Sequence, residues 1–191
     1  MKSTFKLQKS NAALLIIDMQ KFFRDKESDA QVPGMNQLVP QMKNLIEVFS
    51  KNNRPIIFTR HIDSDDKDNL MLRWWKEQIR EDDELSHVVD DFDTSRGEVI
   101  IKHQYDAFLY TDLEKILKKK KIKQVVICGV LTNICCETTA RSAFMRGFEV
   151  YFVTDATATY KKEMHDAALL NLSYGFAVLM TTADILKSLS K

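Results

Sequence analysis

Residues 13–18 read Ala-Leu-Leu-Ile-Ile-Asp, an apolar run without alternation that ends in a carboxylate. A strand of a parallel sheet is covered on both faces, so its sequence is continuously apolar. Five further runs have this character and are predicted as strands: 55–60, 98–102, 124–129, 149–154 and 176–181. Helical spacing is found in the intervening stretches 35–53, 70–79, 112–121, 134–147, 162–174 and 183–189. The alternation predicts a parallel sheet with helices on both faces.

Length and composition narrow the class of protein. The chain has 191 residues, so we expect one domain over 1–191. Hydrophobic residues make up 45% and charged residues 29%, a composition that excludes disorder and coiled coil. The 28 basic and 27 acidic residues give a net charge of +1, so neither nucleic acid nor a membrane is an expected partner.

The three cysteines include an adjacent pair, an arrangement that cannot form a disulfide framework and suits a reducing compartment. No apolar stretch reaches the length of a signal-peptide core or a membrane span. We therefore expect a cytoplasmic protein.

Polar residues at strand ends are the remaining candidates for chemistry. The five glycines form neither a dinucleotide-binding nor a P-loop motif. In an open parallel sheet, ligands bind at the carboxyl ends of the strands, where Asp18 and Lys102 each end an apolar run. Asp18 is interpreted as functional, with capping of the next turn as the alternative. Lys102 is equally compatible with an active-site cation and with a snorkelling side chain.

Helical spacing separates the adjacent cysteines Cys135 and Cys136. If a helix begins near Ile134, Cys136 shares a stripe with small or apolar residues, which is typical of a packed face. Cys135 falls on a line of hydroxyl side chains in the first turns. A helix amino terminus and a nearby lysine both lower the pKa of a thiol. We therefore expect Cys135 to be an activated nucleophile with a pKa below the usual ~8.5, with a small buried side chain as the alternative.

Several motifs follow one another in a characteristic order and spacing: Ile17-Asp18-Met19-Gln20 with Phe23, Ile101-Lys102 with Tyr105 and Ala107-Phe108, Gly129-Val130-Leu131-Thr132-Asn133-Ile134-Cys135, Thr138-Thr139-Ala140 through Ala143 and Gly147, and Asp155-Ala156. Together they resemble the isochorismatase-like superfamily, which includes the cysteine hydrolases. The resemblance spans most of the chain. It implies a three-layer αβα fold with a mostly parallel six-stranded sheet of Rossmann-like topology. It also implies a cis peptide bond between Val130 and Leu131, and a homodimer or homotetramer.

The resemblance further implies a catalytic triad of Asp18, Lys102 and Cys135. In such a triad Asp18 accepts the thiol proton, Lys102 stabilises the thiolate, and Cys135 attacks an amide or ureido carbonyl. The backbone N–H groups of Leu131 and Cys135 are the expected oxyanion donors, and a thioester is then hydrolysed. This C–N bond hydrolysis needs no cofactor, and none is expected.

Two other functions stay open. An isochorismatase-type vinyl ether hydrolase would use Asp18 as the acid, with Cys135 incidental. A non-catalytic ligand-binding or redox-sensing protein would use the Cys135–Cys136 pair. We favour the cysteine hydrolase because the chain keeps the sulfur in a complete triad.

The sequence departs from family nicotinamidases, which carry an Asp-x-His metal site after the second strand. Here that stretch reads Thr59-Arg60-His61-Ile62-Asp63, so we expect neither a metal site nor nicotinamide as the substrate. Arg60 is a candidate to bind a substrate carboxylate. Of two adjacent tryptophans on a helix, at most one can line a pocket. The side chains expected to contact a small-molecule substrate are those of Phe23, Arg60, Trp74, Tyr105 and Thr139.

Overall fold

The computed structural model describes residues 4–66 and 68–190, in which six strands form one all-parallel sheet of order β3-β2-β1-β4-β5-β6. The strands are β1 (Ala12–Ile17), β2 (Ile56–His61), β3 (Glu98–Lys102), β4 (Gln124–Val130), β5 (Glu149–Ala158) and β6 (Val178–Met180). The α-helices are α1 (Met35–Lys51), α2 (Leu70–Trp75), α3 (Leu113–Lys119), α4 (Glu137–Met145), α5 (Lys162–Gly175) and α6 (Thr182–Leu189).

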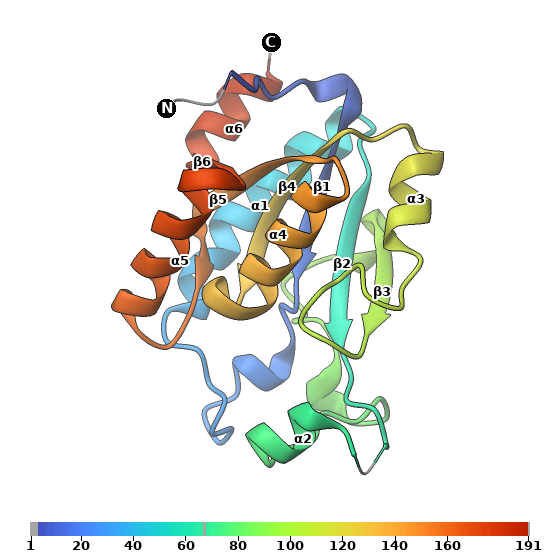
Figure 1. The fold of residues 1–191 in the computed structure, drawn as a ribbon, viewed down its shortest axis with the longest axis vertical. Coiled ribbons are helices and arrows are strands. Elements are labelled where there is room, and N and C mark those ends of the chain that lie inside the picture. Colours follow the sequence, from blue (N-terminus) through green and yellow to red (C-terminus); the bar gives the residue numbers. More distant parts are fainter. Residues whose placement is uncertain (1–3, 67, 191) are drawn as a thin grey trace.

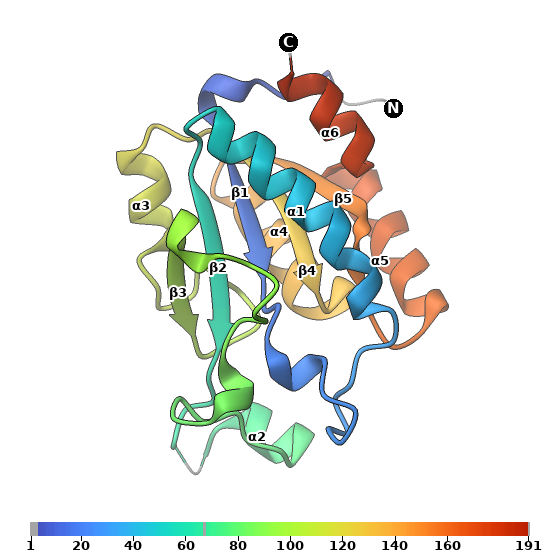
Figure 2. The same cartoon turned by 180° about the vertical axis from the view of Figure 1, so that it is seen from behind.

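Helices cover both faces of the sheet, which confirms the predicted three-layer fold. Helices α3, α4 and α5 lie in front of the strands in Figure 1, whereas α1 and α6 lie in front in the reverse view of Figure 2. Each face has its own apolar core, one built on α1 and α6 and the other on α3, α4 and α5. Every residue of β1 and β4 is buried, as expected for central strands whose sequence is continuously apolar.

The strand order reverses direction between β1 and β4. The chain passes from β1 outward to β2 and β3, then returns to β4 and continues outward to β5 and β6. A reversal of this kind leaves a crevice at the carboxyl ends of the two central strands, because their connections leave in opposite directions. Helix α2 lies beyond that edge of the sheet in both views (Figures 1 and 2).

Among the predicted elements whose bounds differ are two helices and the last strand. The helix expected over 70–79 ends at Trp75, because Lys76 adopts a left-handed conformation with φ 61° and turns the chain. The helix expected over 134–147 is divided into one π-helical turn, η5 (Thr132–Cys136), followed by α4. The strand expected over 176–181 is reduced to Val178–Met180 at the sheet edge.

Within the described ranges, no helix combines the length and the hydropathy required to cross a membrane.

Candidate active site

Asp18 lies directly after β1, at the point where the strand order reverses. Its φ of 47° turns the chain sharply away from the sheet, a conformation that aspartate tolerates better than most residues. The side chain is fully buried. Thr59, on the neighbouring strand β2, donates its hydroxyl to Asp18 Oδ1 at 2.6 Å and accepts the Asp18 backbone N–H at 3.0 Å. These two bonds hold the backbone and the carboxylate of Asp18 in place, and Thr59 was not among the residues predicted for the site.

Lys102 ends β3 and reaches toward Asp18 across the carboxyl end of the sheet. Its Nζ lies 2.7 Å from Asp18 Oδ2 and donates to Cys135 Sγ at 3.5 Å and to the carbonyl oxygen of Gln104 at 2.8 Å. The ammonium is fully buried. Burial lowers the pKa of Lys102, but its interactions with the Asp18 carboxylate and the Cys135 sulfur outweigh burial and place the pKa above the usual value. Lys102 is therefore a cation that joins the two other members of the predicted triad.

Cys135 is carried by the π-helical turn η5, which follows the end of β4. The Val130–Leu131 peptide bond just before this turn is cis, at the bond for which the resemblance implied this geometry. The Cys135 side chain is buried among apolar residues, as is that of Cys136. Asp18, Lys102 and Cys135 are thus brought together from the ends of three strands, β1, β3 and β4.

The pKa of Cys135 differs from the sequence-based expectation. Burial raises the pKa of its thiol to about 12, because the low-polarity surroundings disfavour the thiolate. The positive charge of Lys102 lowers it and the negative charge of Asp18 raises it, and neither reverses the effect of burial. Burial therefore acts against the low pKa that the sequence predicted for the Cys135 thiol.

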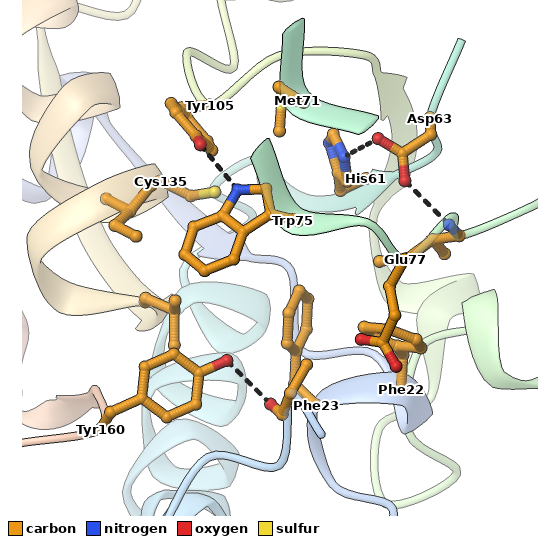
Figure 3. A pocket seen from close by; sticks show the side chains of 14 residues that line it. Phe22, Phe23, His61, Asp63, Met71, Trp75, Glu77, Tyr105, Cys135 and Tyr160 are labelled. Atoms are coloured by element: carbon orange, nitrogen blue, oxygen red, sulfur yellow. Dashed lines mark hydrogen bonds and ion pairs between the residues drawn. The ribbon is translucent and has the colours of Figure 1, made fainter. Parts of the chain in front are cut away.

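A pocket with a volume of about 70 Å³ opens next to Cys135. Its lining is mostly apolar and aromatic (Figure 3). The lining residues are Phe22, Phe23, Ala30, His61, Asp63, Met71, Trp75, Glu77, Ile79, Tyr105, Leu131, Ile134, Cys135 and Tyr160. A mainly apolar cleft with a few convergent polar groups is the usual form of a small-molecule site.

Of the five side chains predicted to contact substrate, Phe23 and Tyr105 line this pocket. Trp75 lines it in place of Trp74, which is 76% exposed. The two tryptophans point in different directions on α2, and Trp75 Nε1 donates to the Tyr105 hydroxyl at 2.8 Å. Trp74, predicted to contact substrate, therefore lies outside this lining, because helical spacing alone does not show which face of α2 meets the pocket.

Arg60 and Thr139 lie outside the pocket lining. The Arg60 guanidinium donates to the hydroxyl of Ser86 at 2.6 Å and to the carbonyl of Ser86 at 3.1 Å, so it holds the 81–86 loop. The Thr139 hydroxyl is fully buried; it accepts the Ala107 N–H at 3.0 Å and donates to the Tyr105 carbonyl oxygen at 3.4 Å. Thr139 therefore supports the loop that carries Tyr105.

Gln20 connects the loops around the site. Its side-chain amide donates to the carbonyl oxygens of His61 and Ser86 at 2.9 and 2.8 Å, and its Oε1 accepts the His61 N–H at 2.7 Å. Gln20 is fully buried. It belongs to one of the motifs that carried the resemblance, but its role was not identified there.

His61 and Asp63 form a buried pair in the pocket wall and do not fit a metal site. His61 Nε2 lies 3.2 Å from Asp63 Oδ1, and Asp63 Oδ2 accepts the Ile79 N–H at 2.8 Å. His61 Nδ1 is buried without a partner among the described residues. A zinc site needs three or four protein ligands, and in the described part of the chain no three His, Cys, Asp or Glu side chains are grouped to hold a metal.

Comparisons with known proteins identify related sequences and related folds. The model of the isochorismatase domain family matches residues 12–184. Nicotinamidase 3 of Arabidopsis thaliana is 39% identical over 183 residues, which are 93% of this chain and 88% of that protein. A cysteine hydrolase from Pseudomonas syringae pv. phaseolicola 1448A has the same fold, with a TM-score of 0.93, 22% identity, and coverage of 100% of this chain and 97% of that chain. The pyrazinamidase of Pyrococcus horikoshii, solved in complex with zinc, has a TM-score of 0.80 and 28% sequence identity, with coverage of 90% of this chain and 99% of that chain.

Proposed function

Since the chain belongs to the isochorismatase family of hydrolases, we propose that it is a cysteine hydrolase that cleaves the C–N bond of small amides or ureido compounds. One observation carries the proposal: the buried Lys102 ammonium lies 2.7 Å from Asp18 Oδ2 and 3.5 Å from Cys135 Sγ, beside the pocket. A nucleophile, a base and a cation in mutual reach are the parts that acyl transfer to sulfur requires. The relatives named nicotinamidase and pyrazinamidase support the same class of bond.

The first half-reaction begins with a protonated thiol, because the pKa of Cys135 is raised to about 12. Asp18 accepts this proton as the sulfur attacks the carbonyl carbon, and the nearby Lys102 stabilises the developing thiolate. The resulting oxyanion is bound by backbone N–H groups of Leu131 and Cys135. Asp18 then returns the proton to the leaving nitrogen, the C–N bond breaks, and ammonia or an amine departs from the thioester.

The second half-reaction hydrolyses the thioester. A water molecule attacks its carbonyl carbon and gives a proton to Asp18, and the C–S bond breaks as the second tetrahedral intermediate collapses. The acid is released, and the proton returns to the Cys135 sulfur. Thr59 keeps one carboxylate oxygen of Asp18 engaged at 2.6 Å, which leaves Oδ2 on the side of Lys102 for both proton transfers.

Nicotinamide belongs among the compounds to test. The expectation that it is not the substrate rested on the missing Asp-x-His pattern. That reason is weaker in view of the 39% identity to a protein named nicotinamidase. The identity extends over 93% of this chain, although this chain lacks the Asp-x-His pattern. The absence of a fitting metal group therefore does not remove small ring amides from the substrate class.

The experiment compares Cys135→Ala with Cys136→Ala, a matched control one residue away. Nicotinamide, other small amides and ureido compounds are screened for release of ammonia, and isochorismate is tested for vinyl ether cleavage. We expect Cys135→Ala to lower kcat/KM on the amide at least about 10³-fold, because the nucleophile is lost, and Cys136→Ala to change it only a few-fold. Acid-quenched wild-type enzyme should carry an acyl group on the Cys135 peptide by mass spectrometry.

Two results would contradict the proposal. Turnover of isochorismate that survives in Cys135→Ala would identify a vinyl ether hydrolase that uses Asp18 as the acid. Failure of every amide, ureido compound and isochorismate, with ligand binding retained, would identify the non-catalytic alternative.

A further inference from the structure

The charged side chains of the pocket wall are of one sign. In the part of the chain that the structure describes, no lysine or arginine lines the pocket, whereas Asp63 and Glu77 both do. Both carboxylate oxygens of Asp63 already have partners, since Oδ1 contacts His61 Nε2 and Oδ2 accepts the backbone N–H of Ile79. Glu77 has no hydrogen-bond or ion-pair partner among the described residues. Glu77 is therefore a carboxylate that is available to a bound molecule.

The fold holds Glu77 at the pocket by a short turn. Helix α2 ends at Trp75, and Lys76 takes a left-handed conformation. Ile79 is then tied to Asp63 by two hydrogen bonds, with the Asp63 N–H donating to the Ile79 carbonyl at 2.9 Å and the Ile79 N–H donating to Asp63 Oδ2 at 2.8 Å. Between these fixed points the backbone of Glu77 is held at the edge of the pocket, and its exposed side chain contributes to the lining.

Aromatic rings share the pocket lining with this carboxylate. In Figure 3 the Glu77 side chain points toward Phe22, Trp75 and Phe23 lie at the centre of the view, and Tyr160 lies on the opposite side. The field of Glu77 also reaches the pocket interior: burial raises the pKa of Tyr160, and the negative charge of Glu77 raises it further. The faces of aromatic rings carry partial negative charge and attract cations, in the same sense as a carboxylate.

We propose that Glu77, together with the rings of Phe22, Phe23 and Trp75, selects small amides that carry a cationic group, such as a substituted ammonium or a guanidinium. The amide carbonyl is placed at Cys135, and this part rests on the proposed function. A carboxylate group on a bound molecule is repelled by Glu77, and no lysine or arginine among the described residues lines the pocket to neutralise it. The Lys102 ammonium does not neutralise that carboxylate, because it is already paired with Asp18 at 2.7 Å. Isochorismate, a dicarboxylate, is disfavoured on the same ground.

Binding of three non-hydrolysable probes tests this charge preference separately from catalysis. They are benzyltrimethylammonium, benzyl alcohol and benzoate, which share a ring and differ in charge. The chain has two tryptophans, so a Trp74→Phe background leaves Trp75 as the only indole to report binding by fluorescence, and calorimetry gives an independent dissociation constant. The variants are Glu77→Gln, Glu77→Lys and the matched control Glu81→Gln, an exposed acid outside this pocket.

The cation is expected to bind more tightly than benzoate in the Trp74→Phe background. Glu77→Gln should weaken binding of the cation by about fivefold and leave benzyl alcohol unchanged, while Glu77→Lys should reverse the order and Glu81→Gln should change nothing. Benzoate binding as tightly as the cation, or an unchanged ratio in Glu77→Gln, would overturn the inference even if amides are hydrolysed. A preference that depends on Glu77, found in a protein that hydrolyses no amide, supports the inference and counts against the proposed function alone.

Discussion

The pKa of Cys135 is decided by three influences on one sulfur atom. Burial raises it most, Lys102 lowers it and Asp18 raises it, which gives a value of about 12. Alkylation requires the thiolate, whose fraction grows about tenfold per pH unit below the pKa. We therefore expect iodoacetamide to label Cys135 slowly at pH 7, with a rate that continues to rise well above pH 9.

Charge variants make this prediction specific. Asp18→Asn removes a charge that raises the pKa, so labelling of Cys135 should become faster at a given pH. Lys102→Met removes the charge that lowers it, so labelling should become slower. Rates are read by peptide mapping, with the fully buried Cys128 and Cys136 as internal references. A labelling profile with an apparent pKa below 8 would contradict the pKa set by burial and restore the activated thiolate.

Asp63 links the pocket wall to acid stability. Burial raises the pKa of Asp63, but the hydrogen bonds from His61 and the Ile79 N–H outweigh it and place the pKa below the usual value. A carboxylate with a lowered folded-state pKa stabilises the fold above its unfolded pKa of about 3.9, and this contribution is lost as the pH falls through the folded-state value. Asp63→Asn should therefore lower the urea midpoint at pH 7, and the gap from wild type should shrink below pH 4.

The control for this experiment is Asp82→Asn, because Asp82 is exposed and has no hydrogen bond or ion pair among the described residues. Its urea midpoint should follow that of the wild type at both pH values. A gap for Asp63→Asn that stays constant from pH 7 to pH 3 would show that the loss comes from packing and not from ionisation.

At the scale of an element, Gly129 lets β4 pass close to β1 just before η5, the turn that carries Cys135. Its φ is 126°, and a Cβ there would lie 2.1 Å from the carbonyl oxygen of Ile17. The pairing of β4 with β5 also shifts register between Ile127 and Gly129. A side chain at this position would separate the two central strands and displace both Asp18 and η5.

Gly129→Ala is therefore expected to cost about 2 kcal/mol or more in unfolding free energy, and to reduce any amidase activity by more than its loss of stability explains. Gly175→Ala is the matched control. It ends α5, and an added Cβ there would have no neighbour within 4 Å. Chemical denaturation measures both variants. A Gly129→Ala protein as stable as the control would show that β1 and β4 can separate without cost.

The whole molecule is one sheet shared by two apolar cores. Phe49 of α1 lies in one core and Phe152 of β5 in the other, and both are fully buried. Truncation of a buried phenylalanine to alanine usually costs about 3–5 kcal/mol. Because both cores rest on the same strands, we expect Phe49→Ala and Phe152→Ala each to lower the midpoint of a single transition. Two separate transitions in either variant, by fluorescence and circular dichroism, would show that the cores unfold independently.

Assembly stays a prediction of the resemblance. Several large apolar side chains of α4 and α5 are open to solvent, with Met145 73%, Leu170 72% and Tyr174 95% exposed. Sedimentation equilibrium measures whether the chain forms the expected homodimer or homotetramer, and a monomer at micromolar concentration would contradict that expectation.

The sequence by itself determined the parallel sheet and its two helical layers, because continuously apolar strands such as residues 13–18 can exist only where both faces are covered. It also pointed to Asp18 and Lys102 as polar residues at strand ends and to Cys135 by helical spacing, and the family resemblance joined the three as a triad. Only the tertiary structure decided the surroundings of these groups. Contacts between distant segments place Trp75 and not Trp74 in the pocket lining, and they bring Arg60 within hydrogen-bond distance of Ser86. They also bury Cys135 and so raise the pKa of its thiol. Burial and partner identity are properties of the packed chain, and no local spacing contains them.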